Sequence, residues 1–183
     1  MTPGRIVLIS GTPGTGKSTV AALLARDSQL AASLCLRTDS FYEALRKGAV
    51  PPHLPGSGDQ NQVVIEAFLA AAVRFAQGGY DTLVDGVVGP WFLDPWLAAA
   101  RAGTEIHYFV LRAAKDVTLA RALGRSKLGE SANRELVETM WPLFADLGPW
   151  EPYAVDTTAL FPEETAALLQ AKLGARSHLL PGR

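Results

Sequence analysis

Short apolar runs alternate along the chain with longer segments whose apolar residues recur at helical spacing. The runs with the length and composition of buried strands are residues 5–10, 33–38, 82–85, 105–111 and 153–156. The segments with helical spacing are residues 17–31, 61–77, 93–102, 115–124, 133–147 and 162–173. This alternation predicts an α/β fold, with a parallel sheet of about five strands and helices on both faces.

The positions that directly follow the predicted strands are where this fold class binds its ligands. In open parallel sheets, ligands collect beyond the carboxyl ends of the strands. Those positions hold Gly11 and the residues after it, Asp39, Asp85 and Arg112. The candidate catalytic and binding residues are therefore expected at these positions.

The first of these positions opens a phosphate-binding loop. Residues 11–18 read Gly-Thr-Pro-Gly-Thr-Gly-Lys-Ser, which is the spacing G-x-x-x-x-G-K-[ST]. The glycines permit turns that point successive N–H groups at a phosphate, and the following helix adds the positive end of its dipole. We expect Lys17 to reach the β- and γ-phosphate oxygens and Ser18 to be a Mg²⁺ ligand. The predicted nucleotide-binding residues are Gly11, Thr12, Pro13, Gly14, Thr15, Gly16, Lys17, Ser18 and Thr19.

Acidic residues end the second and third predicted strands. Asp39 lies where it would face the γ-phosphate, so it is the candidate base for an attacking hydroxyl, with a helix N-cap as the alternative role. Asp85 ends an apolar strand beside the phosphate loop, where Mg²⁺ would compensate a buried carboxylate. The alternative for Asp85 is a turn aspartate before Gly86.

Two arginines of the predicted helix at 115–124 and its end complete the candidate catalytic set. Arg121 and Arg125 are four residues apart and share a helix face, which suits the equatorial oxygens of a transferring phosphoryl group. Solvated surface cations are the alternative. Lys127 and Arg112 are weaker candidates for the same role.

Four further features have an open or structural interpretation. The irregular segment 48–60 is either a loop near an acceptor substrate or a plain connector. Residues 91–96, with a tryptophan at each end, are either core or the wall of an apolar acceptor pocket. Cys35 and His107 lie in apolar strands and are expected to be core residues.

Composition and charge limit the classes of partner that the protein is expected to bind. The 183 residues carry 17 basic and 18 acidic side chains, a net charge of −1, which disfavours nucleic acid or an anionic membrane as the main partner. No apolar run has membrane-spanning length and no signal peptide is visible, so the expected compartment is the cytoplasm. The length fits one domain over residues 1–183. Nothing in the sequence predicts an oligomeric state.

Together, residues 11–18, the strand ends at Asp39 and Asp85, and the Arg121-x-x-x-Arg125 spacing resemble the small P-loop kinases that phosphorylate metabolites and antibiotics. The chain is most similar to the chloramphenicol phosphotransferase-like group, in which serine follows the aspartate after strand two. Shikimate kinase carries two acidic residues flanking one position, whereas this chain reads Arg37-Thr38-Asp39, which argues against shikimate as the acceptor.

The resemblance implies more than the residues alone do. It implies a three-layer P-loop NTPase fold with strand order 2-3-1-4-5, an adenine site bordered by the Arg121 helix and residues 156–158, and a mobile lid around residues 121–131. It also assigns the base role to Asp39.

The function expected from these features is ATP- and Mg²⁺-dependent transfer of phosphate to a hydroxyl of a small molecule. Few cations lie between residues 40 and 101, namely Arg46, Lys47, Arg74 and Arg101, which favours a neutral or weakly charged acceptor. The alternative is a regulatory ATPase or GTPase-type switch without an acceptor. A GTPase is disfavoured because residues 113–116 have alanine where the guanine-reading motif needs asparagine.

Overall fold

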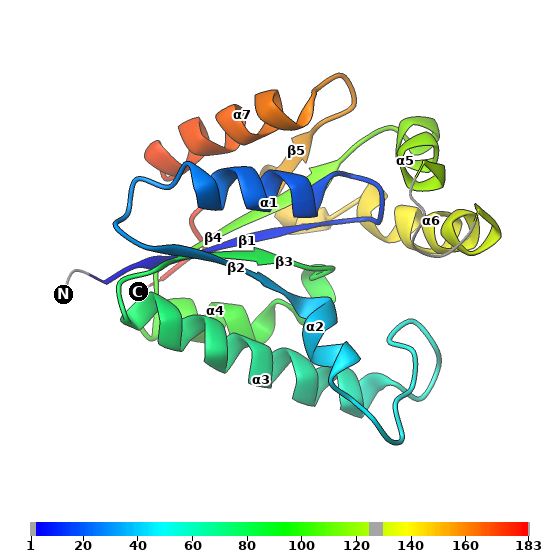
Figure 1. The fold of residues 1–183 in the computed structure, drawn as a ribbon, viewed down its shortest axis with the longest axis horizontal. Coiled ribbons are helices and arrows are strands. Elements are labelled where there is room, and N and C mark those ends of the chain that lie inside the picture. Colours follow the sequence, from blue (N-terminus) through cyan, green and yellow to red (C-terminus); the bar gives the residue numbers. More distant parts are fainter. Residues whose placement is uncertain (1–2, 125–129, 183) are drawn as a thin grey trace.

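A five-stranded parallel sheet forms the middle layer of the protein (Figure 1). The computed structural model describes residues 3–124 and 130–182. The strands are β1 (Arg5–Gly11), β2 (Ser33–Arg37), β3 (Asp81–Asp85), β4 (Ile106–Arg112) and β5 (Ala154–Asp156). They are hydrogen-bonded in the order β2-β3-β1-β4-β5, and every neighbouring pair is parallel. The strand order that the resemblance implied is therefore confirmed.

Helices cover both faces of the sheet and its carboxyl end. The helices are α1 (Lys17–Arg26), α2 (Thr38–Glu43), α3 (Gly58–Gln77), α4 (Asp94–Arg101), α5 (Lys115–Leu123), α6 (Glu130–Ala145) and α7 (Pro162–Gly174). Short 3₁₀ turns occur at η1 (Pro90–Phe92) and η2 (Gly148–Tyr153). Figure 1 shows α1 and α7 on one face, α3 and α4 on the other, and α5 and α6 beyond the ends of the strands where the β1–α1 loop turns. No helix among the residues described is both long and apolar enough to span a membrane.

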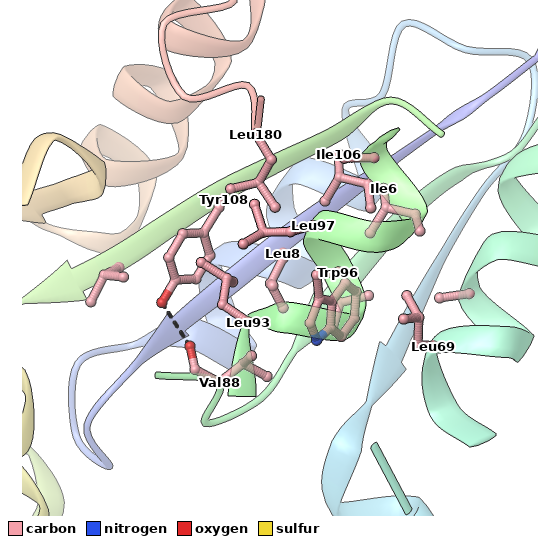
Figure 2. Packing of buried hydrophobic residues seen from close by; sticks show 14 of the residues in the cluster. Ile6, Leu8, Leu69, Val88, Leu93, Trp96, Leu97, Ile106, Tyr108 and Leu180 are labelled. Atoms are coloured by element: carbon pink, nitrogen blue, oxygen red, sulfur yellow. Dashed lines mark hydrogen bonds between the residues drawn. The ribbon is translucent and has the colours of Figure 1, made fainter. Parts of the chain in front are cut away.

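The alternation of side chains along β1 divides the core into two layers. Ile6 and Leu8 point to one cluster with α3 and α4, whereas Val7 and Ile9 point to another with α1 and α7. All four are fully buried. Figure 2 shows the first cluster, in which Trp96 and its helix pack over β1 and β4. A strand buried on both faces explains why β1 reads as an uninterrupted apolar run.

Most predicted boundaries are confirmed within a few residues, and the largest difference is at the end of α1. That helix stops at Arg26 rather than at residue 31, because the chain turns at Asp27 and Ser28 donates a hydrogen bond to Asp81 (2.5 Å). The expectation that Cys35 is a core residue is wrong, since β2 is an edge strand and Cys35 is exposed on it.

The C-terminal segment seals the outer edge of β4. Leu179 forms an antiparallel bridge with His107, and backbone bonds join Tyr108 to His178 and Leu180 to Ile106. His107 is fully buried and bonds to Glu105 (Nε2 to Oε1, 2.9 Å), so its interpretation as a core histidine is confirmed. Burial lowers the pKa of His107, and the imidazole is neutral at pH 7.

Candidate functional site

The loop between β1 and α1 adopts the backbone that its glycines allow. Gly11, Gly14 and Gly16 have φ angles of 135°, 95° and 91°. A Cβ on Gly14 would lie 2.5 Å from the Thr118 carbonyl oxygen, so the loop packs tightly on α5. A Cβ on Gly16 would meet nothing within 4 Å. The loop is therefore packed on one side and open at the start of α1, where an anion would meet the helix N-terminus.

Lys17 lies folded against this loop. Its Nζ donates to the Thr12 carbonyl at 3.0 Å, and Thr15 Oγ1 donates to the same oxygen at 2.9 Å. The lysine is only 9% exposed, whereas the neighbouring Ser18 is exposed. This geometry holds an ammonium group inside the loop, and Ser18 faces outward from the first turn of the helix.

Two cavities open on the loop, and Gly14 lines both. One has a volume of about 430 Å³ and lies between the loop, α5 and the start of α7; we call it the α7 cavity. The other has a volume of about 480 Å³ and lies between the loop, α2, the start of α3 and α6; we call it the α6 cavity. Lys17 and Ser18 line the α6 cavity, and Gly16 and Thr19 line the α7 cavity.

Arg121 forms a wall of the α7 cavity and holds the opposite wall in place. Its guanidinium donates to the carbonyl oxygens of Thr157 (3.2 Å), Thr158 (3.3 Å) and Leu160 (3.2 Å). The residues that follow β5 therefore stay next to the phosphate loop. Arg125, proposed as its partner on the same helix face, lies outside the described residues, as do Lys127 and the rest of segment 125–129 of the expected lid at 121–131.

Asp39 lines the α6 cavity from α2. Its side chain is 67% exposed and pairs loosely with Arg37 (Nη2 to Oδ2, 3.4 Å). The helix begins at Thr38, with Arg37 as the N-cap and no side-chain capping bond. The alternative role of Asp39 as an N-cap is therefore wrong, and its carboxylate is open to the cavity.

Asp85 lines the same cavity from the end of β3 and is 5% exposed. Among the described residues, no side chain donates a hydrogen bond to the Asp85 carboxylate or forms an ion pair with it. The next residue, Gly86, lets the end of β3 lie close to the start of α2, because a Cβ there would lie 2.4 Å from the Thr38 side chain. Asp85 and Ser18 line the same cavity, and because carboxylate and hydroxyl oxygens are ligands that Mg²⁺ prefers, the two residues fit this ion.

A buried polar network fixes the segment after Asp85, and sequence reasoning missed it. Ser10 Oγ donates to the Val88 carbonyl (2.8 Å) and accepts from the Val88 amide (2.9 Å). The Tyr108 hydroxyl donates to the same carbonyl at 2.7 Å, which is the bond drawn in Figure 2. Burial raises the pKa of Tyr108, which keeps the phenol a donor. The network holds Val88 against Ser10 near the end of β1 and against Tyr108 within β4.

The two tryptophans of residues 91–96 have different roles. Trp96, a residue of α4, is fully buried in the core. Trp91 is 47% exposed and lines the α6 cavity, with its ring edge on Phe144 at a centroid distance of 5.4 Å. The core interpretation is thus confirmed for Trp96, and the wall of an apolar acceptor pocket stays a prediction for Trp91.

The irregular loop before α3 also reaches the α6 cavity. Pro52 and His53 line it, which favours a loop beside the site over a plain connector. Tyr42 lines it too, and burial together with the neighbouring Asp39 carboxylate raises the pKa of its phenol. Arg112, a weaker candidate, is instead structural, since it forms a two-bond ion pair with Glu151 (2.8 and 3.0 Å).

Comparison with known proteins places this geometry in a family. The family model of an AAA domain matches residues 7–140. Uncharacterized proteins of Mycobacterium tuberculosis and Mycobacterium bovis are 28% identical over 167 residues, covering 84% of this chain and 32% of their own length. The chain thus spans about a third of the length of these curated relatives.

Solved structures of similar fold include three proteins of named activity or role. A sugar kinase from Janibacter aligns with a TM-score of 0.70 and 17% identity over 94% of this chain and 95% of its own. The tunicamycin resistance protein of Deinococcus radiodurans aligns at 0.66 and 22% over 97% and 99%. The APS kinase of M. tuberculosis, solved with AMPPNP and APS, aligns at 0.67 and 18% over 94% and 98%. These likenesses confirm the P-loop kinase fold, and the family match over residues 7–140 shows that this chain belongs to the AAA domain family.

Proposed function

We propose that this protein transfers the γ-phosphate of ATP to a hydroxyl group of a small molecule. The observation that carries the proposal is that one phosphate loop opens onto two separate cavities, with Gly14 in the lining of both. A donor nucleotide and an acceptor can then approach the same loop from two sides, as in-line transfer requires. The kinase names of several proteins with the same fold support it.

The α7 cavity is proposed to take the nucleoside. It is lined by Gly14, Gly16 and Thr19 of the loop and helix, by Arg121, and by residues 158–162. The phosphates would then follow the loop toward Lys17, whose ammonium exchanges the Thr12 carbonyl for phosphate oxygens. The main role of Arg121 in this proposal is to hold the wall of the α7 cavity through its bonds to Thr157, Thr158 and Leu160.

Phosphoryl transfer is proposed to occur at the α6 cavity. Ser18 and Asp85 would hold Mg²⁺, which when bound offsets charge on the β- and γ-phosphates. Asp39 is exposed to the cavity and would accept the proton of the attacking hydroxyl. Lys17 and backbone N–H groups would stabilise the charge that spreads over the transferring group.

The substitution Asp39→Asn tests this proposal. The side chain is 67% exposed and makes no capping bond, so the fold should tolerate the change. We expect turnover to fall by about 10²- to 10⁴-fold, with ATP affinity preserved. Asp94→Asn is the matched control, because Asp94 also lies in the first turn of a helix and is exposed but lines neither cavity. An Asp39→Asn protein as active as the control would overturn the base role of Asp39 and leave positioning by the phosphate loop as the source of catalysis.

A further inference from the structure

Residues 176–182, which we call the latch, cover the part of the β4 edge that β5 does not reach. β5 is three residues long and pairs with the end of β4. Along the first part of β4, the Tyr108 amide donates to the His178 carbonyl and the Leu180 amide donates to the Ile106 carbonyl, both at 2.8 Å. The Leu180 side chain is buried in the core cluster of Figure 2. The latch therefore protects an edge whose backbone groups would otherwise be open to solvent.

The latch leaves α7 through a strained turn. Arg176 has a φ of 54° and is the one described residue other than glycine with a left-handed backbone. The amides of Arg176 and Ser177 close the end of α7 by donating to the carbonyls of Leu173 and Lys172. Glycine is the usual residue at such a helix end, because a side chain makes the left-handed conformation unfavourable. The turn thus works against the docked position of the latch.

Two side chains hold the latch in place against this strain. Arg176 Nη1 donates to Glu105 Oε2 at 2.8 Å, and the other carboxylate oxygen of Glu105 bonds to His107 Nε2 at 2.9 Å. The imidazole of His178 stacks on the ring of Phe109, with the two centroids 4.7 Å apart. The latch is therefore held by an ion pair at its start and by a buried aromatic contact two residues later.

The buried contact is sensitive to acid. His178 is 3% exposed, and among the described residues its Nε2 has no hydrogen-bond partner. The charged groups that act on its ring are Lys172 of α7 and His107 of β4, and both oppose a positive charge there. Tyr153 of η2, whose ring also contacts His178, stays an uncharged phenol because burial raises its pKa. Burial and the two neighbouring cations lower the pKa of His178 to about 4.

His107 differs from His178 because it has a carboxylate partner. Burial lowers the pKa of His107, Glu105 opposes this shift, and Arg5 and Arg176 add to it. Any charge that His107 gains increases the repulsion on His178. The docked latch thus encloses two neutral imidazoles, and the carboxylate at this edge of the sheet is bonded to His107 rather than to His178.

We propose that residues 176–182 are an acid-sensitive latch, which leaves the edge of β4 as a unit when His178 is protonated while the five-stranded sheet stays folded. Release moves the charged ring into water and lets Arg176 leave its strained conformation, whereas global unfolding would also disrupt both layers of the core. The main cost of release is the exposure of Leu180, which keeps the latch docked at neutral pH. Residues 176–182 line neither the α6 nor the α7 cavity, so this inference does not depend on the proposed function.

The test is hydrogen exchange of backbone amides, followed by NMR at about pH 7.5 and about pH 5. Protection factors are compared, since they correct for the effect of pH on the chemical exchange step. The amides of Tyr108 and Leu180 report on the latch, and those of Val7 and Ile9 in the central strand β1 report on the sheet. Because the pKa of His178 is about 4 in the docked latch and 6.5 in a released one, the protection of Tyr108 and Leu180 should fall about 30-fold at the lower pH.

Two variants and a urea series separate the latch from a purely structural segment. His178→Phe keeps a ring against Phe109 but cannot be protonated, so protection should fall only a few-fold. His53→Phe, at an exposed histidine in the loop before α3, is the matched control and should keep the full fall. Below the unfolding transition, urea should lower the protection of the β1 amides but not that of the latch amides, because local release exposes little surface.

Two results would overturn the proposal. Latch amides that match the β1 amides in protection and in urea dependence would mean that the segment leaves only when the whole protein unfolds. Protection that does not change with pH, or that falls equally in His178→Phe and in the original protein, would mean that His178 does not control release. ATP affinity, measured separately by calorimetry, tests the proposed function whichever result is obtained.

Discussion

Replacing glycines of the phosphate loop separates the cost of folding from the cost of binding. Gly16→Ala places a methyl group where nothing lies within 4 Å, at a φ of 91°. The left-handed backbone costs about 1–2 kcal/mol for a non-glycine residue, partly offset by about 0.4–1 kcal/mol from the lower entropy of the unfolded chain. We expect a loss of roughly 1 kcal/mol in the free energy of unfolding.

Gly14→Ala is the comparison, since it has the same type of backbone but no space. Its φ is 95°, and the methyl group would lie 2.5 Å from the Thr118 carbonyl oxygen, a backbone atom that cannot rotate away. Strain and overpacking together are expected to cost about 2–5 kcal/mol. Gly14→Ala should therefore be the less stable variant in urea unfolding.

ATP affinity, measured by calorimetry, should follow a different order. The Gly16→Ala methyl projects from the open side of the loop at the start of α1, where the phosphates are proposed to lie, so binding should be lost in a protein that remains folded. A Gly16→Ala protein that binds ATP like the original, or one as destabilised as Gly14→Ala, would refute the interpretation of the loop as open at Gly16.

Substitutions at three further residues test other parts of the account. Asp85→Asn should raise the Mg²⁺ concentration needed for half-maximal activity, and an unchanged requirement would make Asp85 structural. Arg121→Ala removes the bonds to residues 157–160, so the KM for ATP should rise more than in Arg121→Lys, and a change confined to kcat would instead support direct contact with the transferring group. Burial, together with the nearby charges of Lys172 and His107, lowers the pKa of His178 to about 4. The folded protein therefore keeps its full stability above pH 6.5, and it loses stability as the pH drops toward 4, because the unfolded chain binds a proton that the folded His178 does not. The free energy of unfolding should fall by about 3 kcal/mol over this pH range, and His178→Phe should reduce this fall when unfolding is measured as a function of pH.

The fold and the phosphate loop were predictable because local pattern determines them. A strand buried on both faces must be apolar, as β1 is, and the glycines of residues 11–18 occupy backbone conformations that other residues avoid. Cys35 was mispredicted because an apolar run does not reveal whether its strand lies at an edge or in the centre of the sheet. That distinction depends on the strand order.

Only part of the wall of the α6 cavity could be predicted, because its residues come from distant segments. Asn61 lies on α3 and Trp91 in η1, and only the folded chain brings both into the lining of one cavity with α6. Two signals in the sequence pointed to this wall, namely residues 91–96 as a pocket wall or core and segment 48–60 as a loop near the acceptor or a connector. Leu136, Met140 and Leu143 of α6 also line the cavity, although helical spacing alone assigns such residues to the core. The role of Arg121 as a clamp likewise needs the position of residues 157–160 after β5.

The most direct test of the central claim follows the γ-phosphate itself. The protein is incubated with Mg²⁺ and ATP labelled in the γ-phosphate, together with a panel of hydroxylated small molecules, and the products are separated and identified by mass spectrometry. The account predicts label in the phosphate ester of an organic acceptor, lost in Lys17→Ala and strongly reduced in Asp39→Asn. Label found only in inorganic phosphate, at a rate that no acceptor changes, would contradict it.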